Sequence, residues 1–288
     1  MALLARASAA RGRRRLSVRQ AVLLGLVQGP AEVLPMSSSG HLVLVPALLD
    51  WPYARLPGDV RKAFEVALHA GAGLALAWLL RDDVVAAAKD PFGATLLAGP
   101  ASAVAFALEP VIEERVSSPG IAAAAQVVAG SALAVADTAG ARHVTNGGHT
   151  DALQKLAIGL SQAFALVPGT SRNGITFTAA RALGLDRETA ARLSWRAGLP
   201  IIGGATFLKV MRLAQRGLAP ELRVPFAAGA AAAFASTVAA RPLLRVRRQR
   251  LTGAYRIALG LFALRRLGRP AWRGGPARRR DRLEWLRG

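Results

Sequence analysis

The sequence of 288 residues contains no cysteine and few aromatic residues, and its acidic residues number 17 against 38 lysines and arginines. Without cysteine, the chain forms no disulfide and no thiolate metal site. It also lacks a glycine-rich Walker lysine loop and a dinucleotide fingerprint, so we expect no nucleotide to supply energy. Hydrophobic residues make up 52% of the chain and aromatics only 6%. The apolar content is therefore mostly alanine, leucine and valine, which is typical of helical membrane proteins.

Repeated apolar runs are the main positive feature of the chain. A helix needs about 20 residues to cross a hydrocarbon core of roughly 30 Å, so several of these runs are marginal in length. Alanine-rich runs also occur in buried helices of large soluble proteins, but so many in one chain favour an all-α polytopic membrane bundle. The runs cover residues 33–49, 64–80, 92–108, 119–136, 197–208, 224–240 and 251–264.

The net charge of +21 is concentrated at the two ends of the chain. Residues 1–19 hold six arginines and no acid, and residues 241–288 hold fifteen arginines against two acids. Such tails can bind nucleic acid, but beside membrane helices they favour anionic lipid headgroups and a cytoplasmic position. We therefore predict no nucleic-acid partner and both termini in the cytoplasm. The predicted parts are a basic arm (1–19), one membrane domain (20–264) and a basic tail (265–288).

Two polar stretches interrupt the apolar pattern and resemble each other. They are GLVQGPAEVLPMSSSGH, residues 25–41, and GLSQAFALVPGTSRNG, residues 159–174. Each opens with Gly-Leu-x-Gln and continues through an apolar half-turn to a proline and small hydroxyl residues. An alignment on the two prolines pairs Ser37 with Thr170 and Ser38 with Ser171.

The likeness of the two stretches predicts an internal duplication, with inverted topology, of halves at about 20–140 and 150–264. Chance similarity of two Gly/Ser-rich loops is the alternative. The helix before the first loop, residues 20–34, would rise only about 22 Å, which is less than the core thickness. Irregular backbone at membrane depth survives only where it lines a polar cavity or is buried in protein. We therefore expect two re-entrant helical hairpins that meet around one polar pocket.

The ionisable residues of these loops indicate what the pocket binds. Intramembrane ionisable residues are costly and mark functional sites by default. Arg172 offers a fork of donors that matches phosphate oxygens, and Glu32 suits a phosphate site only as a base or as the ligand of a divalent cation. A Glu32–Arg172 pair that only holds the loops together is the structural alternative. The expected pocket residues are Gln28, Glu32, Ser37, Ser38, Ser39, His41, Thr170, Ser171, Arg172 and Asn173.

The two loops resemble the signatures of the undecaprenyl-diphosphatase family, integral membrane enzymes that dephosphorylate the polyprenyl diphosphate carrier of cell-wall synthesis. QGPAEVLPMSSSGH and PGTSRNGIT are similar to its two motifs, and the similarity extends through residues 62–84 and 183–205. The resemblance implies a multi-pass protein of the cytoplasmic membrane with inverted repeats and two re-entrant hairpins. It also implies hydrolysis of undecaprenyl diphosphate to the monophosphate and inorganic phosphate, with a divalent cation, and a link to bacitracin resistance.

The resemblance also implies roles for single residues. Ser38 attacks or orients a water, Glu32 or His41 takes the proton, and Arg172 grips the diphosphate. Glu32 also binds the cation, Mg²⁺ or Ca²⁺. Two departures stand out, because the family usually has glutamate at the position of Gln28 and serine at the position of Asn173. The expected substrate-binding residues are Gln28, Ser37, Ser39, Glu65, Thr170, Ser171 and Asn173.

One rival function comes from another class of protein. Inverted repeats with broken helices and a central anion site also describe transporters of anionic solutes and flippases of lipid phosphates. The same residues would then bind a phosphate without cleaving it. Phosphate release from a prenyl diphosphate separates the two. The expected partners are the polyprenyl diphosphate and the bilayer, and a homo-oligomer is compatible with this sequence.

Overall fold

The computed structural model describes residues 16–115, 118–139, 150–216, 218–246 and 248–268, and every regular element in these ranges is a helix. The predicted all-α fold is therefore confirmed, whereas most of both predicted basic tails lies outside the described residues. The elements are α2 (Val18–Val33), α3 (Ser38–Leu48), η1 (Pro52–Arg55), α4 (Gly58–Leu79), α5 (Arg81–Lys89), α6 (Pro91–Arg115), α7 (Pro119–Ala139), α8 (Ala152–Ser161), η2 (Gln162–Leu166), α9 (Arg172–Ala182), α10 (Arg187–Arg216), α11 (Pro220–Ala239), η3 (Arg241–Arg245) and α12 (Arg250–Leu267).

Two of the described helices, α7 and α11, are long and apolar enough to cross a membrane. Helices α4 and α5 are bent by 81° and add a third span only if the pair counts as one. The seven apolar runs therefore do not each form one long apolar helix. The run at 33–49 is broken between α2 and α3, because Leu34 precedes Pro35 and takes an extended conformation that ends the first helix.

Large apolar side chains lie exposed on the outside of the bundle. Examples are Trp78 on α4, Val128 and Val135 on α7, Phe207 on α10 and Phe262 on α12. Soluble monomers rarely expose so many large apolar side chains, whereas lipid tails cover them in a bilayer. With the apolar helices, this surface is that of a membrane helical bundle.

Small residues let the central helices α2 and α11 approach closely. A Cβ added to Gly25 or Gly29 would collide with the backbone of α11 at Gly229 or Ser236. The Ser236 hydroxyl fills the gap, since it donates to the carbonyl of Gly25 (2.8 Å) and accepts from the N–H of Gly29 (3.2 Å). Close packing through glycine and serine is how helices associate when lipid removes the hydrophobic driving force.

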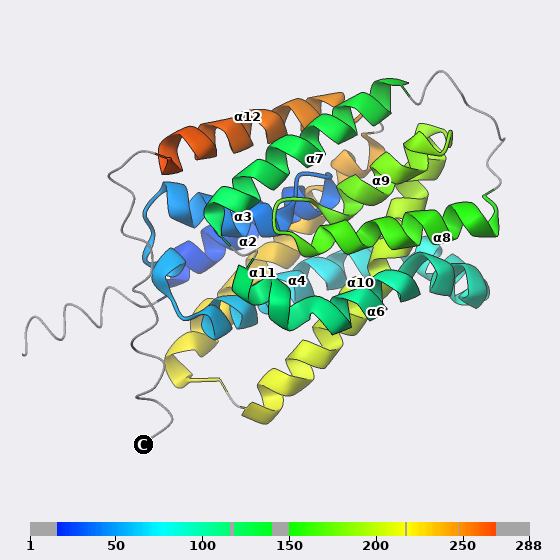
Figure 1. The fold of residues 1–288 in the computed structure, drawn as a ribbon. Coiled ribbons are helices and arrows are strands. Elements are labelled where there is room, and N and C mark those ends of the chain that lie inside the picture. Colours follow the sequence, from blue (N-terminus) through cyan, green and yellow to red (C-terminus); the bar gives the residue numbers. More distant parts are fainter. Residues whose placement is uncertain (1–15, 116–117, 140–149, 217, 247, 269–288) are drawn as a thin grey trace, which may run out of the picture.

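Helices α7 and α12 run side by side along one edge of the molecule (Figure 1). Gly130 and Gly253 bring their backbones together, because a Cβ on Gly253 would lie 2.7 Å from the carbonyl oxygen of Gly130. Buried Asp137 on α7 accepts hydrogen bonds from the N–H groups of Gln249 (3.0 Å) and Arg250 (3.2 Å), where α12 begins. These contacts fix α12 behind the two loops that form the site.

Candidate active site

The first loop of the site follows α2, whose last turn carries Glu32. Beyond the break at Pro35, Ser37 takes a left-handed conformation with φ of 72°. Its Oγ accepts a hydrogen bond from the N–H of Gly40 (3.2 Å) and so caps α3. A non-glycine residue in this region costs about 1–3 kcal/mol, and such strain gathers at functional sites.

The second loop has the same local structure. Ser171 has a φ of 67°, and its Oγ accepts a hydrogen bond from the N–H of Gly174 (3.1 Å) at the start of α9. Gly169, two residues before it, has a φ of 99°, which glycine adopts without strain. The two loops therefore start their second helices with the same cap.

The cap geometry corrects the expected alignment of the loops by one residue. The prolines pair Ser37 with Thr170 and Ser38 with Ser171, but in the structure Ser37 and Ser171 share a positive φ and the same capping bond. Ser38 therefore corresponds to Arg172, and each is the first residue of its helix. A proline ends the preceding helix without defining where the next one begins.

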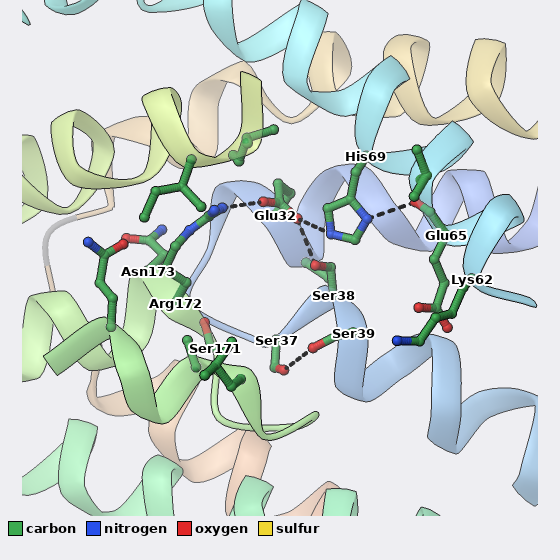
Figure 2. A pocket seen from close by; sticks show the side chains of 17 residues that line it. Glu32, Ser37, Ser38, Ser39, Lys62, Glu65, His69, Ser171, Arg172 and Asn173 are labelled. Carbon is green, nitrogen blue, oxygen red and sulfur yellow. Dashed lines mark hydrogen bonds and ion pairs between the residues drawn. The ribbon is translucent and has the colours of Figure 1, made fainter. Parts of the chain in front are cut away.

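The carboxylate of Glu32 lies between the two loops (Figure 2). Ser38 Oγ donates to its Oε2 (2.7 Å), and Gln28 Nε2 donates to the same oxygen (3.2 Å). From the second loop, Arg172 Nη2 donates to Oε1 at 3.3 Å, with the Arg172 side chain 22% exposed and that of Glu32 8% exposed. Glu32 thus joins the two loops.

His69 on α4 is a site residue that the sequence analysis missed. Its Nδ1–H donates to the carbonyl of Glu65 (2.8 Å), and its Nε2 lies 3.7 Å from Oε2 of Glu32. A carbonyl only accepts, so Nδ1 carries a proton, and Nε2 is the ring nitrogen on the side of the carboxylate. Lys62, Glu65 and His69 follow one face of α4 at helical spacing, and this pattern is visible in the sequence.

A cavity of about 310 Å³ contains these groups. Figure 2 shows Arg172 and Asn173 on one side of it, Lys62 and Glu65 on the other, and Glu32 between them. The structure thus brings together eight of the eleven predicted site residues. Those that line the cavity are Glu32, Ser37, Ser38, Ser39, Glu65, Ser171, Arg172 and Asn173.

Three predicted site residues do not line this cavity: Gln28, His41 and Thr170. Gln28 is buried and acts on Glu32 through its hydrogen bond. His41 is buried behind the first loop, where Nδ1 donates to the carbonyl of Ser37 (2.8 Å) and Nε2 accepts from the hydroxyl of Tyr255 (2.7 Å). With both ring nitrogens engaged, His41 holds the Ser37 turn from behind.

A second, larger cavity of about 780 Å³ adjoins the first. His69 and Ile202 line both cavities, and the second one runs between α4, α5, α6 and α10. Its walls are almost wholly apolar, with side chains such as Leu74, Leu199 and Phe207. A polar chamber and an apolar chamber therefore meet at His69.

The donors of the polar cavity suit one kind of metal site. Among the described residues, no group of three or more histidine, aspartate or glutamate side chains is placed to hold a metal ion. Mg²⁺ commonly takes only one or two protein carboxylates and completes its shell with substrate phosphate oxygens and water. Glu32 and Glu65 both line the cavity, so these two carboxylates are the protein groups there that could hold such a cation, and they would supply only part of its ligands.

Comparison with known proteins decides the family. Residues 21–262 match the model of a family described as bacitracin resistance protein BacA. The chain belongs to the BacA family. Among its relatives, the undecaprenyl-diphosphatase of Geotalea daltonii is 38% identical over 267 residues, covering 85% of this chain and 96% of the relative. The undecaprenyl-diphosphatase of Trichlorobacter lovleyi is 37% identical and covers 86% of this chain and 96% of the relative. That of Geobacter metallireducens is 42% identical and covers 70% of this chain and 78% of the relative. BacA membership confirms the resemblance that the two loops indicated.

Proposed function

We propose that this BacA-family protein is an undecaprenyl-diphosphatase, which hydrolyses undecaprenyl diphosphate to undecaprenyl phosphate and inorganic phosphate and so recycles the lipid carrier. The observation that carries this proposal is the Glu32 carboxylate, which accepts a hydrogen bond from Ser38 Oγ and one from Arg172 in a single cavity. A hydroxyl with a base, beside a guanidinium that matches phosphate, is the set that phosphoryl transfer needs. The relatives that carry the same name support it.

The polar cavity suits the diphosphate headgroup. Helices α3 and α9 both begin at its wall, so their N-terminal N–H groups and dipoles favour an anion there. Arg172 and Lys62 add cationic side chains on opposite sides (Figure 2). The bond from Arg172 to Glu32 is long at 3.3 Å and engages one Nη atom, so the rest of the fork is left to bind phosphate oxygens.

The apolar cavity suits the prenyl tail. A lipid diphosphate needs an apolar space that continues from the headgroup site, and the two cavities share His69 and Ile202. The exposed apolar side chain of Phe207 lies at this cavity, toward the lipid-facing surface. We place the first isoprene units in this space, with the remainder of the tail in the bilayer.

The arrangement of hydroxyl and carboxylate defines two routes of hydrolysis. In one, Ser38 Oγ attacks the terminal phosphorus, its proton passes to Glu32, and the bond to the bridging oxygen breaks to release undecaprenyl phosphate. Water then hydrolyses the phosphoserine. In the other, Ser38 and Glu32 orient a water that attacks directly. In both, Arg172 stabilises charge on the transferring phosphoryl group, and His69 is placed to relay the proton from Glu32.

We further propose that a divalent cation, Mg²⁺ or Ca²⁺, takes part in the reaction, and the carboxylates of Glu32 and Glu65 on the cavity wall are the residues that would hold it. Its contribution would be to neutralise charge on the leaving phosphate. The proposal rests on the oxygen donors of the cavity and on the repulsion that a bare carboxylate would exert on a diphosphate.

The short hairpins support a finer proposal for topology. Helices α2, α3, α8 and α9 have 16, 11, 10 and 11 residues, and each is too short to span the core on its own. We propose that α2–α3 and α8–α9 are re-entrant hairpins of two inverted repeats, in a multi-pass protein of the cytoplasmic membrane with both termini inside the cell.

Phosphate release by the purified protein in detergent tests the function. With undecaprenyl diphosphate and Mg²⁺ or Ca²⁺, the wild type releases inorganic phosphate, and the Ser38→Ala and Glu32→Gln variants release little. A transporter or flippase would instead move the lipid across proteoliposomes without releasing phosphate. The Ser38–Glu32 hydrogen bond and the names of the relatives do not favour that alternative.

A further inference from the structure

Arg256 on α12 is fully buried, at 0% exposure, and the mechanism above makes no use of it. Its guanidinium makes four hydrogen bonds within the described part of the chain, and all four go to neutral oxygens. Nε donates to Oε1 of Gln126 (2.8 Å) and Nη1 to the carbonyl of Pro35 (3.1 Å). Nη2 donates to the carbonyls of Gly169 and Thr170, at 2.7 Å each.

These acceptors belong to both active-site loops. Pro35 lies two residues before the left-handed Ser37, and Thr170 lies directly before the left-handed Ser171. One rigid, planar group therefore spans the two strained turns at which α3 and α9 begin. Gln126 extends the contact, because its Nε2 donates to the carbonyl of Met36 (3.0 Å) in the first loop.

Ordinary fold stability does not require this arrangement. Burying a guanidinium is costly, and well-packed apolar residues in place of buried charged groups often stabilise a fold as well or better. Arg256 does not line the cavity of about 310 Å³, so it acts on a bound substrate only through the loops. The planar guanidinium instead fixes the distance between the carbonyl of Pro35 in the first loop and those of Gly169 and Thr170 in the second.

We propose that Arg256 is a positioning residue that sets the gap between Ser38 and Arg172 by holding the two loops to one guanidinium. Ser38 and Arg172 contact opposite oxygens of Glu32, at 2.7 and 3.3 Å, so their separation depends on how the loops meet. A displacement of about 1 Å in such a site lowers turnover roughly 100-fold. The kinetic part of this inference rests on the proposed function, and the geometric part does not.

The kinetic test compares Arg256→Lys with Arg181→Lys. Arg181 is the control, because it is also buried, at 1% exposure, but its guanidinium donates only to the carbonyl of Leu185, just beyond the end of α9, among the described residues. Lysine keeps the charge, but its three donors sit on one nitrogen and cannot serve the four acceptors of Arg256 at the spacing of the planar fork. We expect Arg256→Lys to lower kcat about 100-fold with KM little changed, and Arg181→Lys to lower only the melting temperature. Equal kcat in the two variants would overturn the proposal.

A distance measurement tests the geometry without activity. The chain has no native cysteine, so Ser39→Cys with Asn173→Cys gives one spin-label pair across the loops. We expect one narrow distance distribution with Arg256 present and a broad one with Arg256→Lys. An unchanged distribution would contradict the proposal even if activity fell. If the wild type releases no phosphate, the proposed function fails while this measurement still decides the role of Arg256.

A milder variant, Gln126→Ala, tests the proposal even if Arg256→Lys folds poorly. Gln126→Ala removes the bonds from Gln126 to Arg256 and to Met36 and leaves the buried charge in place. We expect it to broaden the same distance distribution and to lower kcat about tenfold, in proportion to the bonds lost. Wild-type kcat together with a wild-type distribution in Gln126→Ala would overturn the proposal.

Discussion

The two loops of the site have similar backbone turns and differ in their side chains. Ser37 and Ser171 hold the same turn and lie 134 residues apart in the sequence. When the loops are aligned with this offset of 134 residues, Glu32 of the first loop corresponds to Leu166 of the second. The repeated frame thus supplies a carboxylate on one side only.

The first residues of α3 and α9 also differ between the two loops. Ser38 in the first loop stands where the second loop has Arg172, and both donate to the carboxylate of Glu32. A nucleophile with its base therefore comes from one loop and an anion-binding fork from the other. Neither loop alone has the groups for phosphoryl transfer, so the site exists only where the two meet.

We expect the largest effect from removing the carboxylate of Glu32, which only the first loop supplies. Glu32→Gln keeps the size of the side chain and removes its charge and basic lone pair, so we expect kcat for phosphate release to fall about 10³-fold. Lipid binding should persist. A purely structural Glu32–Arg172 pair predicts instead a loss of about 3–5 kcal/mol in stability, because a buried guanidinium is left unpaired. Thermal melting, lipid binding and phosphate release on one preparation distinguish the two readings.

A swap between the loops sharpens this test. Glu32→Leu combined with Leu166→Glu moves the carboxylate to the equivalent place on the second loop, where the first residue of the following helix is Arg172 and not a serine. We expect the double variant to stay as inactive as Glu32→Gln. Recovered phosphate release in the double variant would show that the asymmetry of the two loops does not matter.

The next largest effect concerns the guanidinium of Arg172 on the second loop. Arg172→Lys keeps the positive charge but loses the paired donors, so we expect kcat to fall about 100-fold in a protein that still folds. Ser38→Arg, which places a guanidinium at the equivalent position of the first loop, should not rescue it. Near-normal turnover of Arg172→Lys would mean that a simple charge is enough and that Arg172 does not grip the phosphate.

A smaller effect separates the two histidines. His69 faces Glu32 from the cavity wall, so His69→Gln should lower kcat about tenfold by removing the proton relay. His41 contacts Ser37 and Tyr255 behind the loop, so its partner can be removed gently with Tyr255→Phe. We expect Tyr255→Phe to lower kcat only about threefold, the worth of one ordinary hydrogen bond. The reverse order of effects would return the proton transfer to His41.

Sequence reasoning found the fold class and the two loops because proline, glycine and serine stand out in an apolar chain. It missed the register, since Pro35 and Pro168 mark where helices end while the caps at Ser37 and Ser171 set where the next ones begin. His69 was visible in principle at helical spacing from Lys62 and Glu65.

Other parts of the site depend on contacts that no local pattern carries. The partner of His41 is Tyr255, which lies 214 residues further along the chain. Only the packing of α12 on α7 brings it behind the first loop. Residue type predicted a polar role for His41 and could not distinguish a side chain inside the cavity from one behind its wall.

The smallest expected effect is on turnover in Gln28→Glu, a change within the first loop alone. Gln28 is fully buried and donates from Nε2 to Glu32, and its Oε1 has no hydrogen-bond partner among the described residues. A second carboxylate there would lie against that of Glu32, which is unfavourable unless a cation or a proton is shared between them. We therefore expect kcat at saturating Mg²⁺ or Ca²⁺ to stay within about threefold of wild type, and half-maximal activity to need less cation. Gln28→Met, of similar length and without charge, is the control and should leave the cation requirement where it is. Phosphate release across a cation titration measures both, and an unchanged requirement in Gln28→Glu would argue against a cation at Glu32.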